Sequence, residues 1–175
     1  MTDTKTKILD LAEDLTQLKG FNGFSYLDLA AAIGVKNSSI HYHFKAKADL
    51  AIALIMRIRK THMDAFNGLS QQLDTPEERL FSMIEHFKEY TAAEKMCMCG
   101  MMAAEFDSVS PEAQRHLALY FRDLQAWLTK QFIELKHADP QASAFQFLSA
   151  LEGSLLIARL ETNPDLVNQA LKGFF

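Results

Sequence analysis

The residues best suited to chemistry lie between Leu29 and Ala48. This stretch carries three lysines and two histidines and contains no acidic residue. Its serines, asparagine and tyrosine add side chains that can donate hydrogen bonds to phosphate oxygens and base edges. Neither a nucleophile with a general base nor a metal-ligand spacing is present in it. The stretch therefore indicates binding to nucleic acid rather than catalysis.

Two short helices are expected to position these side chains. Ser25 is a suitable N-cap, Asp28 completes a variant of the capping box, and Gly34 ends the first helix. A second helix follows at about residues 37–44, anchored by Ile40 and Phe44. This arrangement predicts a helix-turn-helix whose second helix enters the DNA major groove. The candidate DNA-binding residues are Ser25, Tyr26, Lys36, Asn37, Ser38, Ser39, His41, Tyr42, His43, Lys45 and Lys47.

Some of these side chains have an alternative role. His41 could pack against the preceding helix, and Asn37 could cap the second helix if Lys36 does not. The others that could be ordinary solvated surface are Ser38, Ser39, Tyr42, Lys45 and Lys47.

This region resembles the N-terminal signature of the TetR/AcrR family of transcriptional regulators. The residues that carry the resemblance are Gly20-Phe21, Leu29-Ala30, Gly34-Val35, the run Ile40-His41-Tyr42-His43-Phe44, and Lys47. Lys36 and His41 depart from it, because the family often has Ser or Thr at the first position and Tyr at the second. The resemblance implies a homodimer that binds a palindromic operator and releases it when a small ligand occupies the C-terminal domain.

The rest of the chain has the pattern of a helical bundle. Each of the four prolines follows a good N-cap, in Thr75-Pro76, Ser110-Pro111, Asp139-Pro140 and Asn163-Pro164. Apolar residues between these helix starts recur at intervals of three and four, and no stretch alternates convincingly. We therefore expect an all-α fold of about nine helices. Residues 1–46 would form the DNA-binding domain, and residues 47–175 would form the ligand-binding and dimerisation domain.

A methionine-rich segment is the candidate ligand sensor. Four of the eight methionines lie between Met96 and Met102, and their flexible thioethers suit an irregular apolar pocket. Gap-filling in the core is the alternative. The candidate ligand-binding residues, with Glu105 as a carboxylate at the pocket edge, are Phe66, Phe87, Tyr90, Met98, Met101, Met102, Glu105, Phe121 and Trp127.

The two cysteines have three interpretations. Cys97 and Cys99 could be buried apolar residues, sensor thiols or metal ligands. Burial is favoured, because Lys95 is the only adjacent cation that could activate a thiol and His86 is distant in sequence. No cofactor is expected.

A stripe of small residues within 140–160 is the candidate dimer seam. Such residues allow helices to approach closely, and the same helix carries large apolar residues beside them. Burial inside a single subunit is the alternative. The candidate interface residues are Phe147, Leu151, Ser154, Leu155 and Ala158.

Composition narrows the classes of protein further. The net charge is -4, but residues 1–64 carry nine Lys and Arg against seven Asp and Glu, whereas the remainder carries nine against fifteen. No apolar run is long enough for a membrane span or a signal peptide, so we expect a cytoplasmic protein without a membrane partner. The sequence predicts a ligand-responsive transcriptional regulator, most simply a repressor, with a double-stranded operator and a small-molecule inducer as partners. Transcriptional activation, a thiol-based sensor using Cys97 or Cys99, and a small helical enzyme are the alternatives.

Overall fold

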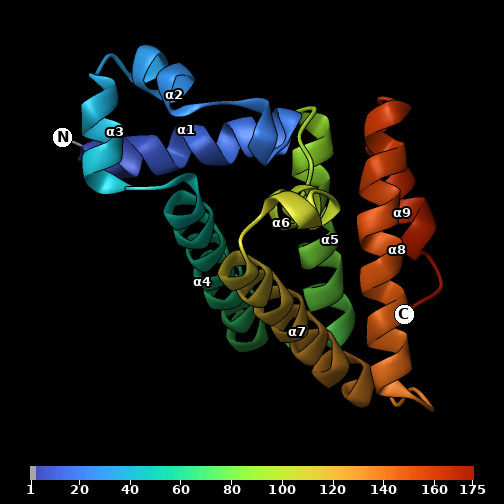
Figure 1. Cartoon of the computed structure of the whole chain (residues 1–175). Helices are drawn as coiled ribbons and strands as arrows, with labels where there is room; N and C mark the ends of the chain where they lie inside the picture. Colours follow the sequence, from blue (N-terminus) through green and yellow to red (C-terminus); the bar gives the residue numbers. More distant parts are fainter. Residues whose placement is uncertain (1–2) are drawn as a thin grey trace. The chain divides into compact units, whose positions relative to one another are not determined.

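The computed structural model describes residues 3–175, and that range is entirely helical apart from its connections, as expected. It contains nine α-helices and two short 3-10 turns and has no strand. The elements in chain order are α1 (Thr4–Lys19), η1 (Phe21–Gly23), α2 (Tyr26–Ile33), α3 (Asn37–His43), α4 (Lys47–Gln72), α5 (Pro76–Ala92), α6 (Met98–Ala104), η2 (Phe106–Ser108), α7 (Pro111–Glu134), α8 (Pro140–Leu160) and α9 (Asp165–Leu171) (Figure 1).

Local capping explains where most of these helices begin. Helices α5, α7 and α8 start at prolines, and Thr75 forms the expected reciprocal capping box with Glu78. The fourth predicted start is one residue too early. Pro164 occupies the N-cap position of α9, and the side chain of Asn163 accepts a hydrogen bond from the backbone N–H of Asp165.

The chain separates into two compact units. Unit 1 contains the chain up to Ile58 together with Met98–Ala118, and unit 2 contains Arg59–Cys97 and Leu119–Phe175. Helices α4 and α7 therefore contribute residues to both units. The division after residue 46 that we expected from the sequence falls inside unit 1.

Unit 1 is built around the first three helices. Helix α1 packs against α2, α3 and α6, and α3 crosses the N-terminal part of α1 (Figure 1). Ile8, Leu29, Ile40 and Leu50 are completely buried between them. Gly34 ends α2 in the left-handed conformation, with φ of 72°, which a side chain would strain.

Unit 2 has an aromatic core. Phe87, Tyr120, Phe132 and Phe147 are completely buried, and α8 packs against both α5 and α9. Apolar residues also cover the opposite side of α8, where Leu160 is exposed. A helix that is apolar on both sides requires a further partner, or it leaves apolar surface in water.

Candidate functional site

The N-terminus of α2 is held by short-range hydrogen bonds. The Ser25 hydroxyl accepts from the backbone N–H of Asp28 at 3.3 Å, and the Asp28 carboxylate accepts from the backbone N–H of Ser25 at 2.7 Å. The Ser25 hydroxyl also donates to the Asp28 carboxylate at 2.7 Å, and this bond, together with the one from the Ser25 backbone N–H, lowers the pKa of Asp28. The predicted capping box is therefore present, and it fixes the direction in which the chain enters α2.

Helix α3 has one anchored face and one open face. Ile40 and Phe44 are buried, whereas the Tyr42 side chain is 83% exposed. The other exposed candidates on and beside α3 are Lys36, Ser38, His41 and Lys45, while Asn37, Ser39 and His43 are half-buried. The open face thus carries hydroxyl, imidazole, phenol and ammonium groups, which suit contacts with phosphates and base edges.

The N-terminus of α3 has no side-chain cap. Neither predicted cap is used, because no side chain caps the helix at Lys36 and the Oδ1 atom of Asn37 is buried without a hydrogen-bond partner among the described residues. His41 shows the packing that was its alternative role, while its DNA contact stays a prediction. It is exposed, and its ring also packs edge-on against Tyr26 with the ring centroids 4.9 Å apart.

Three of the candidate residues are already engaged within unit 1. Ser25 caps α2, and the Tyr26 hydroxyl donates to the carbonyl of Ala46 at 2.7 Å. Burial, with a smaller contribution from Asp49, raises the pKa of Tyr26 to about 12.

Lys47 is engaged in a similar way. Its ammonium group donates to the Phe24 carbonyl at 2.6 Å and lies 4.8 Å from the ring centroids of both Phe21 and Phe24. Partial burial lowers its pKa. The geometry thus gives Lys47 a part in holding the start of α4 to the turn before α2.

The sequence interpretation missed the lysines of α1. Lys5 and Lys7 are exposed, and the Lys5 ammonium lies 6.0 Å from the ring centroid of Phe44. Lys5 thus adds positive charge beside the end of α3. The alternating lysines of the first residues were the available signal, but only the crossing of α1 and α3 brings Lys5 to this place.

The methionine segment belongs to unit 1 from Met98 onward, whereas Met96 belongs to unit 2. Met98 and Met102 are buried, and the end of the Met101 side chain lies over Gly20, where an added Cβ would also collide with the Glu105 carboxylate. Glu105 accepts a hydrogen bond from the backbone N–H of Asn22 at 3.1 Å. This carboxylate therefore holds η1 in place, whereas the sequence had suggested a position at the edge of a cavity.

The Asn22 side chain completes the same connection. Its Nδ2 donates to the Ser108 hydroxyl at 2.6 Å, and that hydroxyl donates to the Glu105 carbonyl at 2.7 Å. The segment after α6 and the turn after α1 are thus joined by a small hydrogen-bonded network.

The remaining candidate ligand residues belong to unit 2, and three of them contact a buried histidine, His62. His62 contacts the Tyr120 hydroxyl at 2.9 Å through Nδ1, and the Tyr90 hydroxyl at 3.0 Å through Nε2. Burial, with a smaller contribution from His86, lowers the pKa of His62 to about 3. The sequence did not single out this histidine. The candidates that contact it or each other in this core are Phe66, Phe87, Tyr90 and Trp127.

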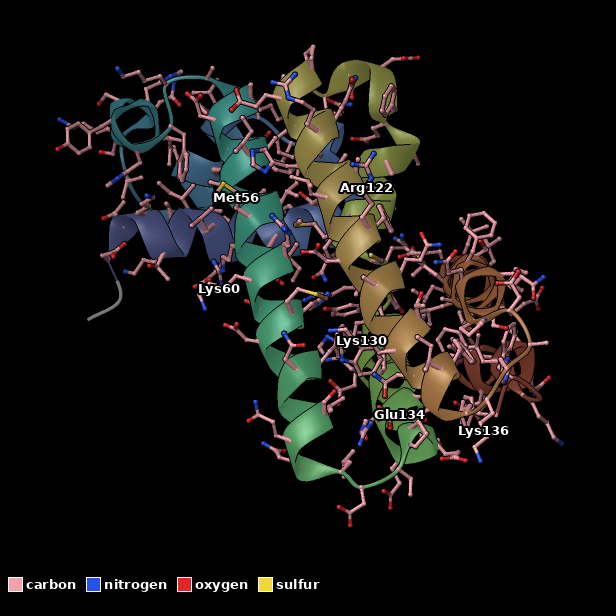
Figure 2. The ribbon with its side chains drawn as sticks, turned by 90° about the horizontal axis from the view of Figure 1, so that it is seen from below. Met56, Lys60, Arg122, Lys130, Glu134 and Lys136 are labelled. Carbon is pink, nitrogen blue, oxygen red and sulfur yellow. The ribbon has the colours of Figure 1, made fainter. Side chains whose placement is uncertain are left out.

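Phe121, the last candidate, lies in a groove between α7 and α8. The groove has a volume of about 320 Å³ and is lined by Phe121, Arg122, Gln125, Phe145, Leu148, Ser149 and Glu152, with Arg122 on α7 (Figure 2). Burial raises the pKa of Glu152 to about 7, against a smaller opposing effect of a hydrogen bond from Cys97. The sequence interpretation missed Glu152, although an acid in a mostly apolar helix was a usable signal.

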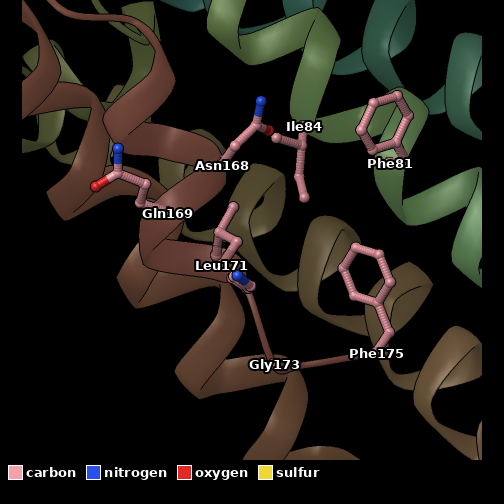
Figure 3. A pocket seen from close by; sticks show the side chains of 8 residues that line it. Phe81, Ile84, Asn168, Gln169, Leu171, Gly173 and Phe175 are labelled. Carbon is pink, nitrogen blue, oxygen red and sulfur yellow. The ribbon is translucent and has the colours of Figure 1, made fainter.

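Two further hollows lie in unit 2. One of about 380 Å³ is bounded by α5 and the C-terminal residues, and Figure 3 shows Phe81, Ile84, Leu171 and Phe175 around it. The other, of about 510 Å³, follows α8 and α9 and includes Gly153.

The predicted dimer residues are not at the surface. Their side chains are at most 5% exposed in the isolated chain, so a second copy would have little of them to contact: these are Phe147, Leu151, Ser154, Leu155 and Ala158. The alternative of burial within one subunit describes them correctly. Exposed apolar residues on the opposite face of α8 are Leu156, Ile157 and Leu160, with Gly153 beside them. The error arose because this helix is apolar on both sides, so sequence spacing could not say which side faces inward.

The cysteines lie in the interior of the protein. Cys97 and Cys99 are both buried, as the favoured interpretation held. Within residues 3–175, no group of three His, Cys, Asp or Glu side chains is placed to hold a metal ion. In the same range, no helix has the length and apolar character needed to cross a membrane.

The helix-turn-helix and the helical second unit define a class, that of DNA-binding transcriptional regulators. Comparison with known proteins agrees: residues 8–54 match the bacterial regulatory proteins of the tetR family, and residues 76–172 match the LmrA/YxaF-like C-terminal domain of transcriptional regulators. The chain belongs to the TetR family.

Individual relatives resemble the chain over nearly its whole length. A TetR transcriptional regulator from Legionella pneumophila is 30% identical, with a TM-score of 0.94 over 99% of this chain and 96% of that one. A TetR-family regulator from Agrobacterium tumefaciens is 25% identical, with a TM-score of 0.91 over 96% and 93%. An uncharacterized HTH-type transcriptional regulator in the lacX 3' region of Lactococcus lactis subsp. lactis is 25% identical over 98% of this chain and 95% of its own length.

Proposed function

We propose that this protein is a repressor that binds a palindromic operator as a homodimer and releases it when a small molecule binds to unit 2. It would act in the cytoplasm and would have no enzymatic activity. The observation that carries the proposal is the division of α3 into a buried anchor at Ile40 and an open polar face that includes Tyr42. A helix buried on one side and open on the other can enter a major groove without rearranging its core.

Charge on this face supports DNA as the partner. Lys36 and Lys45 flank α3, and Lys5 lies beside its C-terminal end, so three exposed ammonium groups surround the polar side chains. Contacts with the phosphate backbone supply most of the affinity of such a surface and fix its orientation. Tyr42, Ser38 and His41 are the candidates for base or phosphate contacts between them.

The exposed apolar face of α8 supports a dimer. Leu156, Ile157 and Leu160 are each more than half exposed, and Gly153 has no atom within 4 Å of the position of an added Cβ. A contiguous apolar surface of this kind is characteristic of a protein interface, and the small glycine allows another helix to approach closely. Two recognition helices held about 34 Å apart would meet successive major grooves on one side of the DNA.

Release by a ligand follows from linkage between the two binding events. A ligand that binds more tightly to a conformation with a different spacing of the recognition helices lowers the affinity for the operator. By reciprocity, the operator lowers the affinity for the ligand by the same factor. Helices α4 and α7 contribute residues to both units and are the natural route for this coupling.

The thiol-sensor alternative has less support. Cys97 is 1% exposed and Cys99 is completely buried. The neighbours of Cys97 include the Tyr120 hydroxyl at 3.9 Å and the carboxyl group of Glu152, and a carboxyl group does not favour a thiolate beside it. Replacing both cysteines by serine should therefore leave ligand-induced release intact.

The test of DNA binding is a titration of labelled duplexes from the flanking region of the gene, followed by fluorescence anisotropy at several salt concentrations. We expect Tyr42→Ala to weaken binding. Lys45→Ala should also weaken it and should reduce the slope of log affinity against log salt by about one, because one ammonium group fewer neutralises a phosphate. Lys130→Ala is the matched control, because Lys130 is exposed on α7 in unit 2 (Figure 2). A wild-type protein that binds no duplex better than random competitor, or an equally weakened control, would refute the proposal.

A further inference from the structure

Glu152 is a half-buried acid that faces the groove between α7 and α8, and its Oε1 atom is buried. It lies on α8 in the same helix as Phe145, Leu148 and Ser149, and Phe121, Arg122 and Gln125 complete the groove from α7. Among the described residues, none donates a hydrogen bond to its Oε1 atom, which is buried. A buried carboxyl oxygen without a donor is costly, so a donor supplied from the groove would be strongly favoured.

The other interactions of Glu152 connect it to the interior of unit 2. The thiol of Cys97 hydrogen-bonds to its carboxyl group, and Cys97 also lies 3.9 Å from the Tyr120 hydroxyl. Tyr120 in turn contacts His62 at 2.9 Å. Glu152 is thus held on its inner side by a polar chain, while its second oxygen has no partner among the residues described.

The remaining walls of the groove fix the kind of molecule that fits. Phe121, Phe145 and Leu148 form an apolar wall, and Gln125 and Ser149 are the uncharged polar groups. Arg122 is exposed, so its charge is solvated and can turn outward, whereas the Glu152 carboxyl group is fixed by its surroundings. The volume of about 320 Å³ falls in the range of small-molecule sites.

We propose that this groove binds an arylalkylamine whose ammonium group donates to Glu152 and whose apolar body packs against Phe121, Phe145 and Leu148. The proposal assigns a ligand class to the inducer site and therefore rests on the ligand-responsive function proposed above. An anionic ligand is disfavoured, since it would bring a second negative group to the carboxyl group of Glu152.

Binding of an ammonium group requires Glu152 in its ionised form, so affinity should depend on pH. The pKa of Glu152 is about 7 in the empty groove, and the charged or titratable groups next to it are Cys97 and, on α7, Arg122. On the helices packed against α8, Glu85 and Lys88 of α5 and Asp165 of α9 form ion pairs with one another. Raising the pH from about 6 to about 8 should therefore increase the affinity for an amine about tenfold.

The experiment compares three indole probes by isothermal titration calorimetry on the full-length protein without DNA. Tryptamine carries an ammonium group, tryptophol a hydroxyl and indole-3-acetate a carboxylate on the same ring. At about pH 8 we expect tryptamine to bind about tenfold more tightly than tryptophol, because a charged donor is worth more than a neutral one. Indole-3-acetate should bind most weakly.

The variant Glu152→Gln should abolish both the preference for tryptamine and its pH dependence. Glu161→Gln, at the exposed C-terminal end of α8, is the matched control and should behave as wild type. The site proposal is overturned if tryptamine shows no binding up to about 5 mM, if the three probes bind equally, or if Glu152→Gln keeps the preference.

A parallel anisotropy titration with an operator duplex separates this inference from the proposed function. Binding that depends on Glu152 and releases the duplex supports both. Binding that depends on Glu152 but leaves operator affinity unchanged supports the site and contradicts its role as the inducer site.

Discussion

Two ionisable groups in unit 2, His62 and Glu152, should have opposite effects on the free energy of unfolding as the pH falls. His62 has a pKa near 3 in the folded protein and an ordinary value of 6.5, so below pH 6.5 only the unfolded chain takes up this proton, and stability is lost. Glu152 has a pKa near 7 and an ordinary value of 4.5, so between these values the folded protein holds a proton that the unfolded chain has released. Its effect is a gain in stability as the pH falls through that window.

The two effects are similar in size. Between about pH 7 and pH 5, His62 costs about 2 kcal/mol of the free energy of unfolding, and Glu152 contributes about 2 kcal/mol in the opposite direction. In the wild-type protein these two groups together should therefore change the free energy of unfolding little between these pH values. Glu152→Gln removes one of the two effects, so its stability should fall by about 2 kcal/mol more than that of the wild type over the same range.

The assay is urea unfolding at fixed protein concentration, followed by the fluorescence of the single tryptophan. Trp127 is buried in unit 2 and donates a hydrogen bond to the Phe66 carbonyl, so its emission reports on the same core. The pKa of His86 is also lowered by burial, but this contribution is common to both proteins and cancels in the difference. The reasoning is refuted if the free energy of unfolding changes with pH in the same way for Glu152→Gln as for the wild type. Glu161→Gln is the control and should follow the wild type.

Two further predictions concern the proposed dimer interface on the exposed face of α8 and the turn after α1. Ile157→Lys places a charge on the exposed apolar face of α8 and should raise the dimer dissociation constant by at least about a hundredfold while leaving the helical circular dichroism intact; a variant that remains dimeric in size-exclusion chromatography with light scattering contradicts the proposed interface. Glu105→Ala removes the acceptor of the Asn22 backbone N–H and should weaken this turn by about 1 kcal/mol. Faster hydrogen exchange of the Asn22 amide is the expected result, and unchanged exchange would show that the carboxylate does not hold η1.

Local signals were sufficient for the helical framework. The caps at Ser25 and Thr75 and the helix end at Gly34 depend on hydrogen bonds between residues three or four positions apart, so the sequence contains all their partners. The exposed face of α3 was predictable for the same reason, since Ile40 and Phe44 define its buried side by helical spacing. The fold class and the family followed from these features.

The placement of several site residues depended on partners far away in the sequence. Lys47 has the chemistry of a phosphate ligand, but in the folded protein the Phe24 carbonyl and two aromatic rings surround its ammonium group. Glu105 has the chemistry of a pocket residue, but its carboxylate accepts from Asn22, which lies 83 positions earlier. Sequence spacing carries no information about such pairs.

The sequence by itself thus determined that this chain forms nine helices within the described range and presents a DNA-reading helix, because capping and helical periodicity are short-range interactions. Only the tertiary structure decided which face of α8 is buried. It also placed Glu152 in a groove, where none of the described residues donates a hydrogen bond to its Oε1 atom. The physical reason is that burial and desolvation depend on the whole packing around a side chain, and a helix that is apolar on both sides does not reveal its orientation on its own.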